Sequence, residues 1–367
     1  MDRTQWPQSA LSPDGPAAAA ILELGWVLVG LAAFVVLLVT GALLYGIFRP
    51  RHYEAEDAPL PISPDLVSKV LGARTSLEPT PGEAVPLEAQ AGVAMEGRRD
   101  VRRDTFDGDR RGLRWIVAGG VAFPVLTMVP LFVLTMRTLA AVEARDAEPA
   151  LTIDVIGRQF WWEVHYRDDE GRRIFETANE IHIPVGRIVL LRLYGADVIH
   201  SFWVPRLAGK LDMIPGRINQ LRLRADAPGI YRGQCAEYCG LQHAKMAFLV
   251  IAEPEDAFRA WARQQARPAA EPADTLALRG RRVFARSACR ACHAIRGTAA
   301  NPSMPGPDLT HLAGRRALAA ASLPNTRGHL GGWISDPQAL KPGNLMPVVP
   351  LAREDFNALL HYLRGLR

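Results

Sequence analysis

The chain has 367 residues, a formal net charge of +5 and 22% charged residues. At roughly 100–200 residues per domain, this length predicts two or three domains. The basic residues are interspersed with acidic ones, which argues against a nucleic-acid-binding protein. Only four cysteines occur, in the close pairs Cys235/Cys239 and Cys289/Cys292. Such pairs can be disulfides, metal ligands or cofactor attachments, so the residues around them must decide.

Two long apolar segments come first in the chain. One covers about residues 21–48 and contains a single acid, Glu23, while the other covers about residues 115–136 and contains no charge. Each exceeds the roughly 20 residues that a helix needs to cross a bilayer. We therefore expect two transmembrane helices. The first is not expected to be a cleavable signal peptide, because it is too long and no basic segment precedes it.

The loop between the two helices, residues 49–112, begins with Arg49 and Arg51 and ends in a run of arginines before Trp115. Lys and Arg near membrane ends mark the cytoplasmic side. The N-terminal region 1–148 is therefore predicted to be a hairpin in a bacterial cell membrane, with both termini on the periplasmic side. The middle of the loop is rich in Pro, Ala and Glu, a composition typical of disorder.

After the second helix the sequence consists of short runs rich in branched residues, which predicts a small all-β domain at residues 149–255. The expected strands are 151–156, 188–194, 218–223 and 248–251. A helical stretch from 256 to about 267 and a Pro/Ala-rich segment form an expected linker, 256–273. The last segment, 274–367, is predicted to be an all-α domain. Its helix-like pieces are 276–287, 329–335 and 354–366.

A cluster of soft and borderline metal ligands lies within residues 235–246. Two thiolates, an imidazole and a thioether favour copper, whereas hard cations prefer oxygen. His200 lies 35 residues upstream and could be brought close by strand pairing. The alternatives are a disulfide, surface histidines and a core methionine, but the combination is hard to produce by chance. The candidate ligands are His200, Cys235, Glu237, Cys239, His243 and Met246.

From the first apolar helix to about residue 255, the chain resembles subunit II of cytochrome c oxidase with its CuA domain. The resemblance rests on segments 197–205 and 210–217 and on the cysteine segment. It implies a cupredoxin-like barrel holding two copper ions, both bridged by Cys235 and Cys239. It also implies that His200 and Met246 complete one copper, and that His243 and the carbonyl of Glu237 complete the other. Two bridging thiolates in a rigid loop suit fast electron transfer.

The aromatic run Gln159-Phe160-Trp161-Trp162 departs from that family. The family's run begins with Trp at the surface that receives electrons from cytochrome c, and Phe160 takes that position here. Phe160, Trp161 and Trp162 are candidates for an electron path, and a packed aromatic strand is the alternative. The change puts in question whether a soluble cytochrome c delivers electrons by the usual route.

The segment Cys289-Arg-Ala-Cys292-His293 matches the attachment motif of c-type haem. One helical turn places both sulfurs along one haem edge, and the adjacent histidine becomes an axial ligand. A redox dithiol, a zinc knuckle and a disulfide are the alternatives. A thioredoxin-like motif would need a βαβ context, which is absent, and a zinc site would need a second ligand pair, which is not near.

The sixth haem ligand should be a methionine in a later loop. Met346 is favoured, because it precedes a predicted C-terminal helix in a segment, 341–347, that resembles the methionine loop of class I cytochromes c. Met304 lies too close to His293 to reach the opposite haem face easily. His311 and His329 are expected to be surface residues.

Both sites on one chain resemble subunit II of a cytochrome-c-fused, caa-type haem–copper oxidase. The fold class expected is multi-domain: a transmembrane hairpin, a cupredoxin-like barrel and a class I cytochrome c domain. The resemblance implies haem c and dinuclear CuA as cofactors, and electron transfer from haem c through CuA to the haem groups of subunit I. Oxygen reduction and proton pumping would occur in subunit I, so no catalytic residue is assigned. The expected partners are subunit I, other oxidase subunits, membrane lipid, and cytochrome c or an upstream respiratory complex as donor.

Two other functions stay open at this point: a subunit of a CuA-containing nitric oxide reductase, and a free-standing membrane electron carrier. Nitrous oxide reductases are disfavoured because they lack the hairpin.

The charge of the C-terminal segment bears on where electrons enter the protein. Residues 274–367 contain 13 Lys/Arg against five Asp/Glu, which should repel basic donors at low salt. A short linker also gives a tethered haem a roughly millimolar effective concentration without a tight interface.

Overall fold

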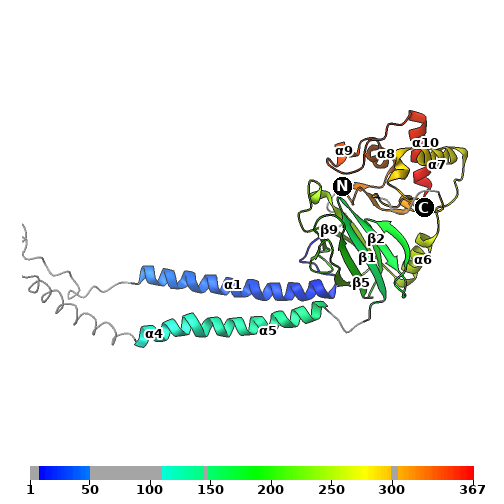
Figure 1. The fold of residues 1–367 in the computed structure, drawn as a ribbon. Coiled ribbons are helices and arrows are strands. Elements are labelled where there is room, and N and C mark those ends of the chain that lie inside the picture. Colours follow the sequence, from blue (N-terminus) through cyan, green and yellow to red (C-terminus); the bar gives the residue numbers. More distant parts are fainter. Residues whose placement is uncertain (1–7, 50–109, 144–147, 299–304) are drawn as a thin grey trace, which may run out of the picture. The chain divides into compact units, whose positions relative to one another are not determined.

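The computed structural model describes residues 8–49, 110–143, 148–298 and 305–367 (Figure 1). The chain divides into two units, one of Val29–Leu134 and one of Met1–Leu28 with Thr135–Arg367. Most of the predicted loop 49–112 lies outside the described residues, as does Met304.

Both predicted apolar helices are present and longer than expected. The first, α1, is Pro16–Phe48, and the second runs through Leu113–Glu143. Their most apolar windows have mean hydropathies of 2.8 and 2.2, and both helices are long and apolar enough to cross a membrane. The second helix consists of α4 (Arg110–Val117), a π-helical turn η3 (Ala118–Ala122) and α5 (Phe123–Glu143).

The region predicted to be all-β forms two five-stranded sheets. One has the order β3-β2-β1-β5-β8 and the other β4-β10-β9-β6-β7. The strands are β1 (Leu151–Arg158), β2 (Trp161–Arg167), β3 (Arg173–Ala178), β4 (Glu180–Pro184), β5 (Val189–Gly195), β6 (His200–Trp203), β7 (Leu211–Met213), β8 (Asn219–Leu223), β9 (Gly229–Cys235) and β10 (Ala247–Glu253). This confirms the cupredoxin-like sandwich, and residues 149–255 are called the β domain below.

The core of the β domain is made by alternating inward-facing residues. In β2, Trp162, Val164 and Tyr166 are buried and their neighbours are partly exposed, as expected for a strand with one face on the core. Helix α6 (Glu255–Ala266) packs on this domain, where Trp261 stacks on His182 with ring centroids 3.9 Å apart. Most of the expected linker 256–273 is therefore a helix fixed to the β domain, which leaves residues 267–273 as the connection.

Residues 274–367, called the C-terminal domain below, are mainly helical. Their elements are α7 (Thr275–Arg286), η5 (Ala288–Ala291), η6 (Leu312–Gly314), β11 (Ala317–Leu318), β12 (Leu323–Pro324), α8 (Arg327–Ser335), α9 (Pro337–Leu340) and α10 (Arg353–Gly365). Asp274 caps α7 by accepting a hydrogen bond from the N–H of Ala277 at 2.7 Å. Helices α7 and α10 pack closely, since a Cβ on Gly280 would lie 2.1 Å from the carbonyl oxygen of Ala358 (Figure 1).

Candidate functional site

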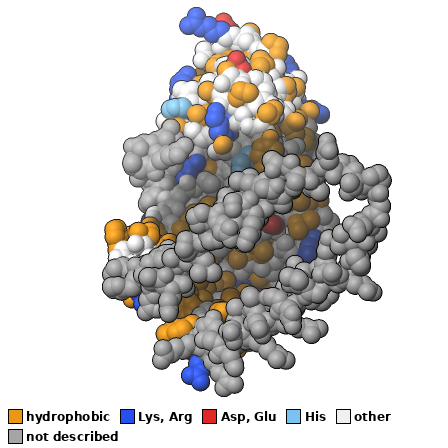
Figure 2. All heavy atoms as spheres, turned by 90° about the vertical axis from the view of Figure 1, so that its left-hand side faces the viewer, with side chains coloured by type: hydrophobic (Ala, Val, Ile, Leu, Met, Phe, Trp, Pro, Cys, Tyr) orange, Lys and Arg blue, Asp and Glu red, His pale blue; other side chains and the backbone are white. Residues whose placement is uncertain are grey.

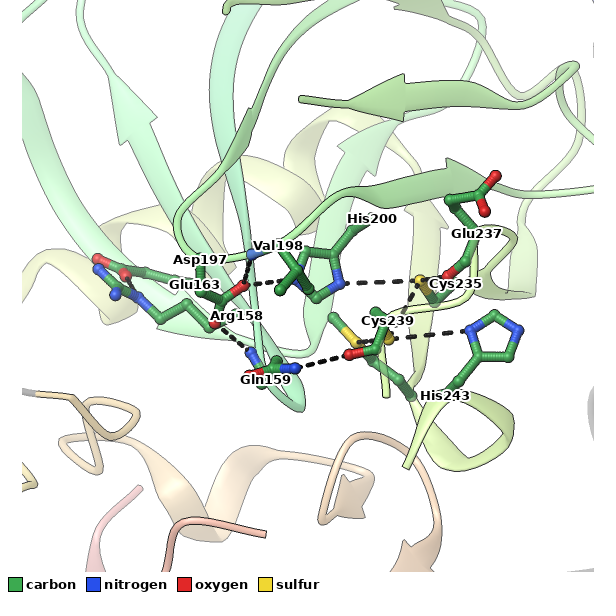
Figure 3. Close-up of polar contacts among 11 residues, drawn as sticks. Arg158, Gln159, Glu163, Asp197, Val198, His200, Cys235, Glu237, Cys239 and His243 are labelled. Atoms are coloured by element: carbon green, nitrogen blue, oxygen red, sulfur yellow. Dashed lines mark hydrogen bonds and ion pairs between the residues drawn. The ribbon is translucent and has the colours of Figure 1, made fainter. Parts of the chain in front are cut away.

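The six predicted copper ligands meet at one end of the β domain (Figure 3). Strands β6 and β9 are neighbours, with Phe202 opposite Cys235, and this pairing brings His200 to the cysteines as the sequence predicted. The closest approaches are Cys235 Sγ–Cys239 Sγ at 3.8 Å, Cys235 Sγ–His200 Nδ1 at 3.8 Å, Cys239 Sγ–His243 Nδ1 at 3.8 Å, Cys239 Sγ–Met246 Sδ at 3.7 Å and Cys235 Sγ–Glu237 carbonyl oxygen at 3.2 Å.

This arrangement fits a thiolate-bridged metal centre. Bonds of about 2.3 Å to sulfur and about 2.0 Å to nitrogen place two ligands of one borderline-soft ion between three and four ångströms apart. The sulfurs of Cys235 and Cys239 are not bonded to each other, and both cysteines are free and buried. A pair of thiolates with imidazole and thioether ligands is the donor set that copper prefers.

Neighbouring groups fix the orientation of His200. Its Nε2 lies 2.8 Å from Asp197 Oδ1, which leaves Nδ1 to face Cys235. Burial lowers the pKa of His200, but the hydrogen bonds to Asp197 and Cys235 prevail, so its pKa is raised overall. Gly157 is required beside it, because a Cβ there would lie 2.8 Å from the imidazole ring. Sequence analysis gave these two neighbours no role of their own.

The C-terminal domain contains a cleft that brings both predicted thioether cysteines and both predicted axial ligands together. Cys289, Cys292, His293 and Met346 all line it. The Nδ1 of His293 lies 2.8 Å from the carbonyl oxygen of Pro307, so its Nε2 is the nitrogen left for iron. Burial lowers the pKa of His293 and favours the neutral imidazole that binds a metal. The donors and the largely apolar lining suit a covalently attached haem.

The loop that carries Met346 is fixed by side chains of its own domain. Asn344 Oδ1 accepts a hydrogen bond from the N–H of Met346 at 2.8 Å, and Gln338 Nε2 donates to the carbonyl of Met346 at 3.0 Å. His329 is exposed, as predicted. The prediction for His311 is wrong: its side chain is buried, and its Nε2 lies 3.1 Å from the carbonyl oxygen of Arg267, outside the cleft.

A second cluster of possible metal ligands, Glu163, His165 and Glu176, lies on β2 and β3. Arg158 pairs with Glu163 at 2.5 Å, and Arg173 pairs with Glu176 at 2.7 Å. Because both carboxylates already have cationic partners, this cluster is better described as an ion-pair network than as a metal site.

The aromatic run lies between the two sites. Phe160 and Trp161 line the same cleft as His293 and Met346. On its other side, the Phe160 ring lies 3.1 Å from the position of a Cβ on Gly240, next to Cys239. Trp162 is fully buried and packs against His200, with ring centroids 6.2 Å apart. Phe160 therefore forms a wall shared by the haem cleft and the cysteine loop, while Trp161 lines the cleft alone.

Two helices that are candidate membrane spans, a cupredoxin-like domain with clustered thiolate, imidazole and thioether groups, and a domain with a haem-attachment motif are the parts of a membrane electron-transfer protein. Residues 168–253 match the family model "Cytochrome C oxidase subunit II, periplasmic domain", and residues 277–367 match "Cytochrome c". The chain belongs to the cytochrome c oxidase subunit 2 family. It is 41% identical over 250 residues to the Alkalihalophilus pseudofirmus subunit 2, covering 66% of this chain and 71% of that protein.

One further relative and one solved structure are also similar to this chain. The subunit 2 of Bacillus sp. (strain PS3) is 33% identical over 263 residues, covering 66% of this chain and 72% of that protein. The periplasmic domain of the Bradyrhizobium japonicum subunit II is 32% identical, with a TM-score of 0.31, covering 32% of this chain and 95% of that one. The chain is thus a subunit of a haem–copper oxidase, an oxidoreductase, and its cofactors are copper in a CuA centre and haem c.

Proposed function

We propose that this chain conducts electrons from its own haem c to its dinuclear copper centre and on to the haem groups of subunit I, where oxygen is reduced. When bound, the two cofactors would supply one-electron redox chemistry to the groups that this chain holds in place. The observation that carries the proposal is the shared wall, because Phe160 touches both the haem cleft and the cysteine loop.

The family resemblance assigns the groups that would hold copper, and the short distances between their donor atoms support it. Cys235 and Cys239 would be the bridging thiolates, His200 and Met246 would complete one copper, and His243 with the carbonyl of Glu237 would complete the other. His200, Cys235, Cys239 and Met246 are buried. Buried ligands held by a second layer of hydrogen bonds keep one geometry in both redox states, which favours fast transfer.

In the C-terminal domain, Cys289 and Cys292 would bind haem covalently, and His293 and Met346 would bind its iron. The hydrogen bond from His293 to Pro307 and the two bonds to Met346 hold both axial ligands in place. Met346 is partly exposed. These residues would hold haem in the cleft that Phe160 and Trp161 also line.

Both redox domains are proposed to lie on the periplasmic side of the membrane, since the arginine run before Trp115 marks the opposite side. The tethered haem is then the main site of electron input. The excess of Lys and Arg in residues 274–367 favours an acidic donor over a basic soluble cytochrome c. On the face shown in Figure 2, Lys and Arg side chains lie mostly apart from one another among apolar and neutral groups.

Cys239→Ser tests the proposed function directly. In the purified oxidase, this variant should lose the near-infrared copper band and stop the oxidation of haem c by oxygen, while haem c stays attached and reducible. Cys292→Ser is the reciprocal control, because it should disturb haem attachment and leave the copper band intact. Normal copper content and turnover in the Cys239→Ser oxidase would show that the bridging assignment is wrong.

A further inference from the structure

The β domain and the C-terminal domain meet at an interface with two buried charged residues, neither of which is a candidate cofactor ligand. Glu180, at the start of β4, is 4% exposed, and Lys341, which begins the methionine loop (residues 341–346), is 2% exposed. Charged side chains are seldom buried this completely unless they are paired or hydrogen-bonded, because burial without a partner is costly. Each of these residues makes hydrogen bonds that cross between the domains.

Glu180 of the β domain receives two backbone hydrogen bonds from the C-terminal domain. Its Oε1 accepts from the N–H of Arg316 at 2.6 Å and from the N–H of Ala317 at 3.0 Å. Burial raises the pKa of Glu180 to about 7, against the smaller opposing effect of these bonds and of nearby arginines. The carboxyl of Glu180 thus accepts hydrogen bonds from backbone N–H groups at the start of β11, as a capping side chain does at the start of a helix.

Lys341 of the C-terminal domain reaches the other way. Its Nζ donates to the carbonyl oxygens of Lys245 at 3.0 Å and Phe160 at 3.4 Å in the β domain, and of Ala319 at 3.1 Å in its own domain. No carboxylate among the described residues forms an ion pair with it. An ammonium group with three donors is fully satisfied by these three carbonyls.

A strained turn lies between these two contacts. Ala319, Ala320 and Ala321 all have left-handed backbone angles, with φ of 53°, 55° and 52°, a conformation that is unfavourable for residues other than glycine. Each carbonyl of this turn accepts a hydrogen bond at the interface. The donors are Lys341 Nζ for Ala319, the N–H of Ala247 at 3.2 Å for Ala320, and Arg232 Nη1 at 3.1 Å for Ala321.

The two metal-ligand loops also touch. Gln242, next to His243, donates from Nε2 to the carbonyl oxygen of Pro342 at 2.6 Å, and Lys245 Nζ donates to Leu340 at 3.1 Å. A small apolar cluster also lies at the interface between the two domains. It consists of Ala247, Leu249, Ile251, Ala317 and Ala321.

We propose that Glu180 and Lys341 are positioning residues that clamp the C-terminal domain onto the β domain, so that the haem cleft is held against Phe160 instead of meeting it by tethered diffusion. This inference rests on the proposed function. Backbone strain, two buried charges and a satisfied set of cross-domain hydrogen bonds are features of a built interface. The same docking covers the aromatic run, which leaves a soluble donor to deliver its electron to the haem domain.

Hydrogen exchange and electron transfer in the loaded oxidase test the clamp. The variants are Glu180→Ala, Lys341→Met and their combination. Glu170→Ala and Arg286→Met are the matched controls, because both residues are exposed. Glu180→Gln is the conservative variant, since its amide oxygen can still accept from Arg316 and Ala317. Exchange of the Ala247 and Ala317 amides is followed by mass spectrometry, and haem oxidation is followed after photoreduction at several solvent viscosities.

Each single variant should speed exchange of these amides roughly ten- to hundred-fold, the factor expected when a buried hydrogen-bonding group loses its partner. The double variant should also slow haem oxidation at least tenfold and make it depend on viscosity. At pH 5, where Glu180 is mostly protonated, the controls and Glu180→Gln should stay like the parent, with viscosity-independent transfer. Parent-like exchange and transfer in the double variant would overturn the clamp. Absence of haem-to-copper transfer in the parent, with its amides still protected, would instead overturn the proposed function.

Discussion

Replacing Glu180 by glutamine should change how the domain interface responds to pH. The pKa of Glu180 is about 7 in the folded chain and 4.5 in its ordinary state, mainly because burial disfavours the charged form. A carboxyl whose pKa is raised contributes stability that is fully present below about pH 4.5 and is lost as the pH rises through about 7. Glutamine has the same shape and an acceptor oxygen, but it does not titrate.

The magnitude follows from the two pKa values. At about 1.4 kcal/mol per pH unit, the difference amounts to roughly 3 kcal/mol, or on the order of a hundredfold in an opening equilibrium. The assay is exchange of the Ala317 amide, which bonds directly to Glu180. Dividing the exchange rate of this amide in the parent by its rate in Glu180→Gln at the same pH removes the pH dependence of the intrinsic exchange rate. This ratio should rise by one to two orders of magnitude between pH 5 and 8. A ratio that stays flat would refute the reasoning.

Three further outcomes are expected. Met346→Ala should lower the haem potential and slow oxidation of natural donors with the copper band unchanged; an unaltered potential in a redox titration would exclude Met346 as a ligand. Gly280→Ala should destabilise the C-terminal domain by about 1–3 kcal/mol, because the new Cβ would lie 2.1 Å from Ala358 O. Denaturation followed by haem absorbance measures this change, and an unchanged midpoint would mean that α7 and α10 move apart without cost. A reporter inserted near residue 90 should be active only in the cytoplasm and one at the C-terminus only outside, whereas protease cleavage of the loop in sealed right-side-out vesicles would reverse the topology.

Most of the candidate cofactor ligands could be picked out in the sequence because they are close in the chain. Cys235, Cys239 and His243 lie within nine residues, and Cys289 and His293 within five. A β-hairpin end or a helical turn is enough to bring such groups together, whatever the rest of the fold. His200 needed one long-range assumption, strand pairing, and β6 and β9 provide it.

The domain interface was not readable, because its partners are far apart and have no local pattern. Glu180 binds backbone groups 136 and 137 residues away, and Lys341 binds Phe160 at a separation of 181. Taken alone, each residue looks like an ordinary surface charge. The sequence predicted a tethered haem that needs no tight interface, whereas the structure shows packed domains. His311 was misjudged for the same reason, since its hydrogen-bond partner, the carbonyl of Arg267, lies 44 residues away in the sequence.

The connection between α6 and α7 sets how far a released C-terminal domain could move. Because Phe258 and Trp261 anchor α6 to the β domain, only residues 267–273 are left to extend, and Ala269 is itself bonded to Arg296 at 2.9 Å. Seven residues reach at most about 25 Å when fully stretched. A C-terminal domain released by loss of the clamp would therefore stay within about 25 Å of the end of α6. The connection would keep it close to the copper centre of its own chain even when the interface is open.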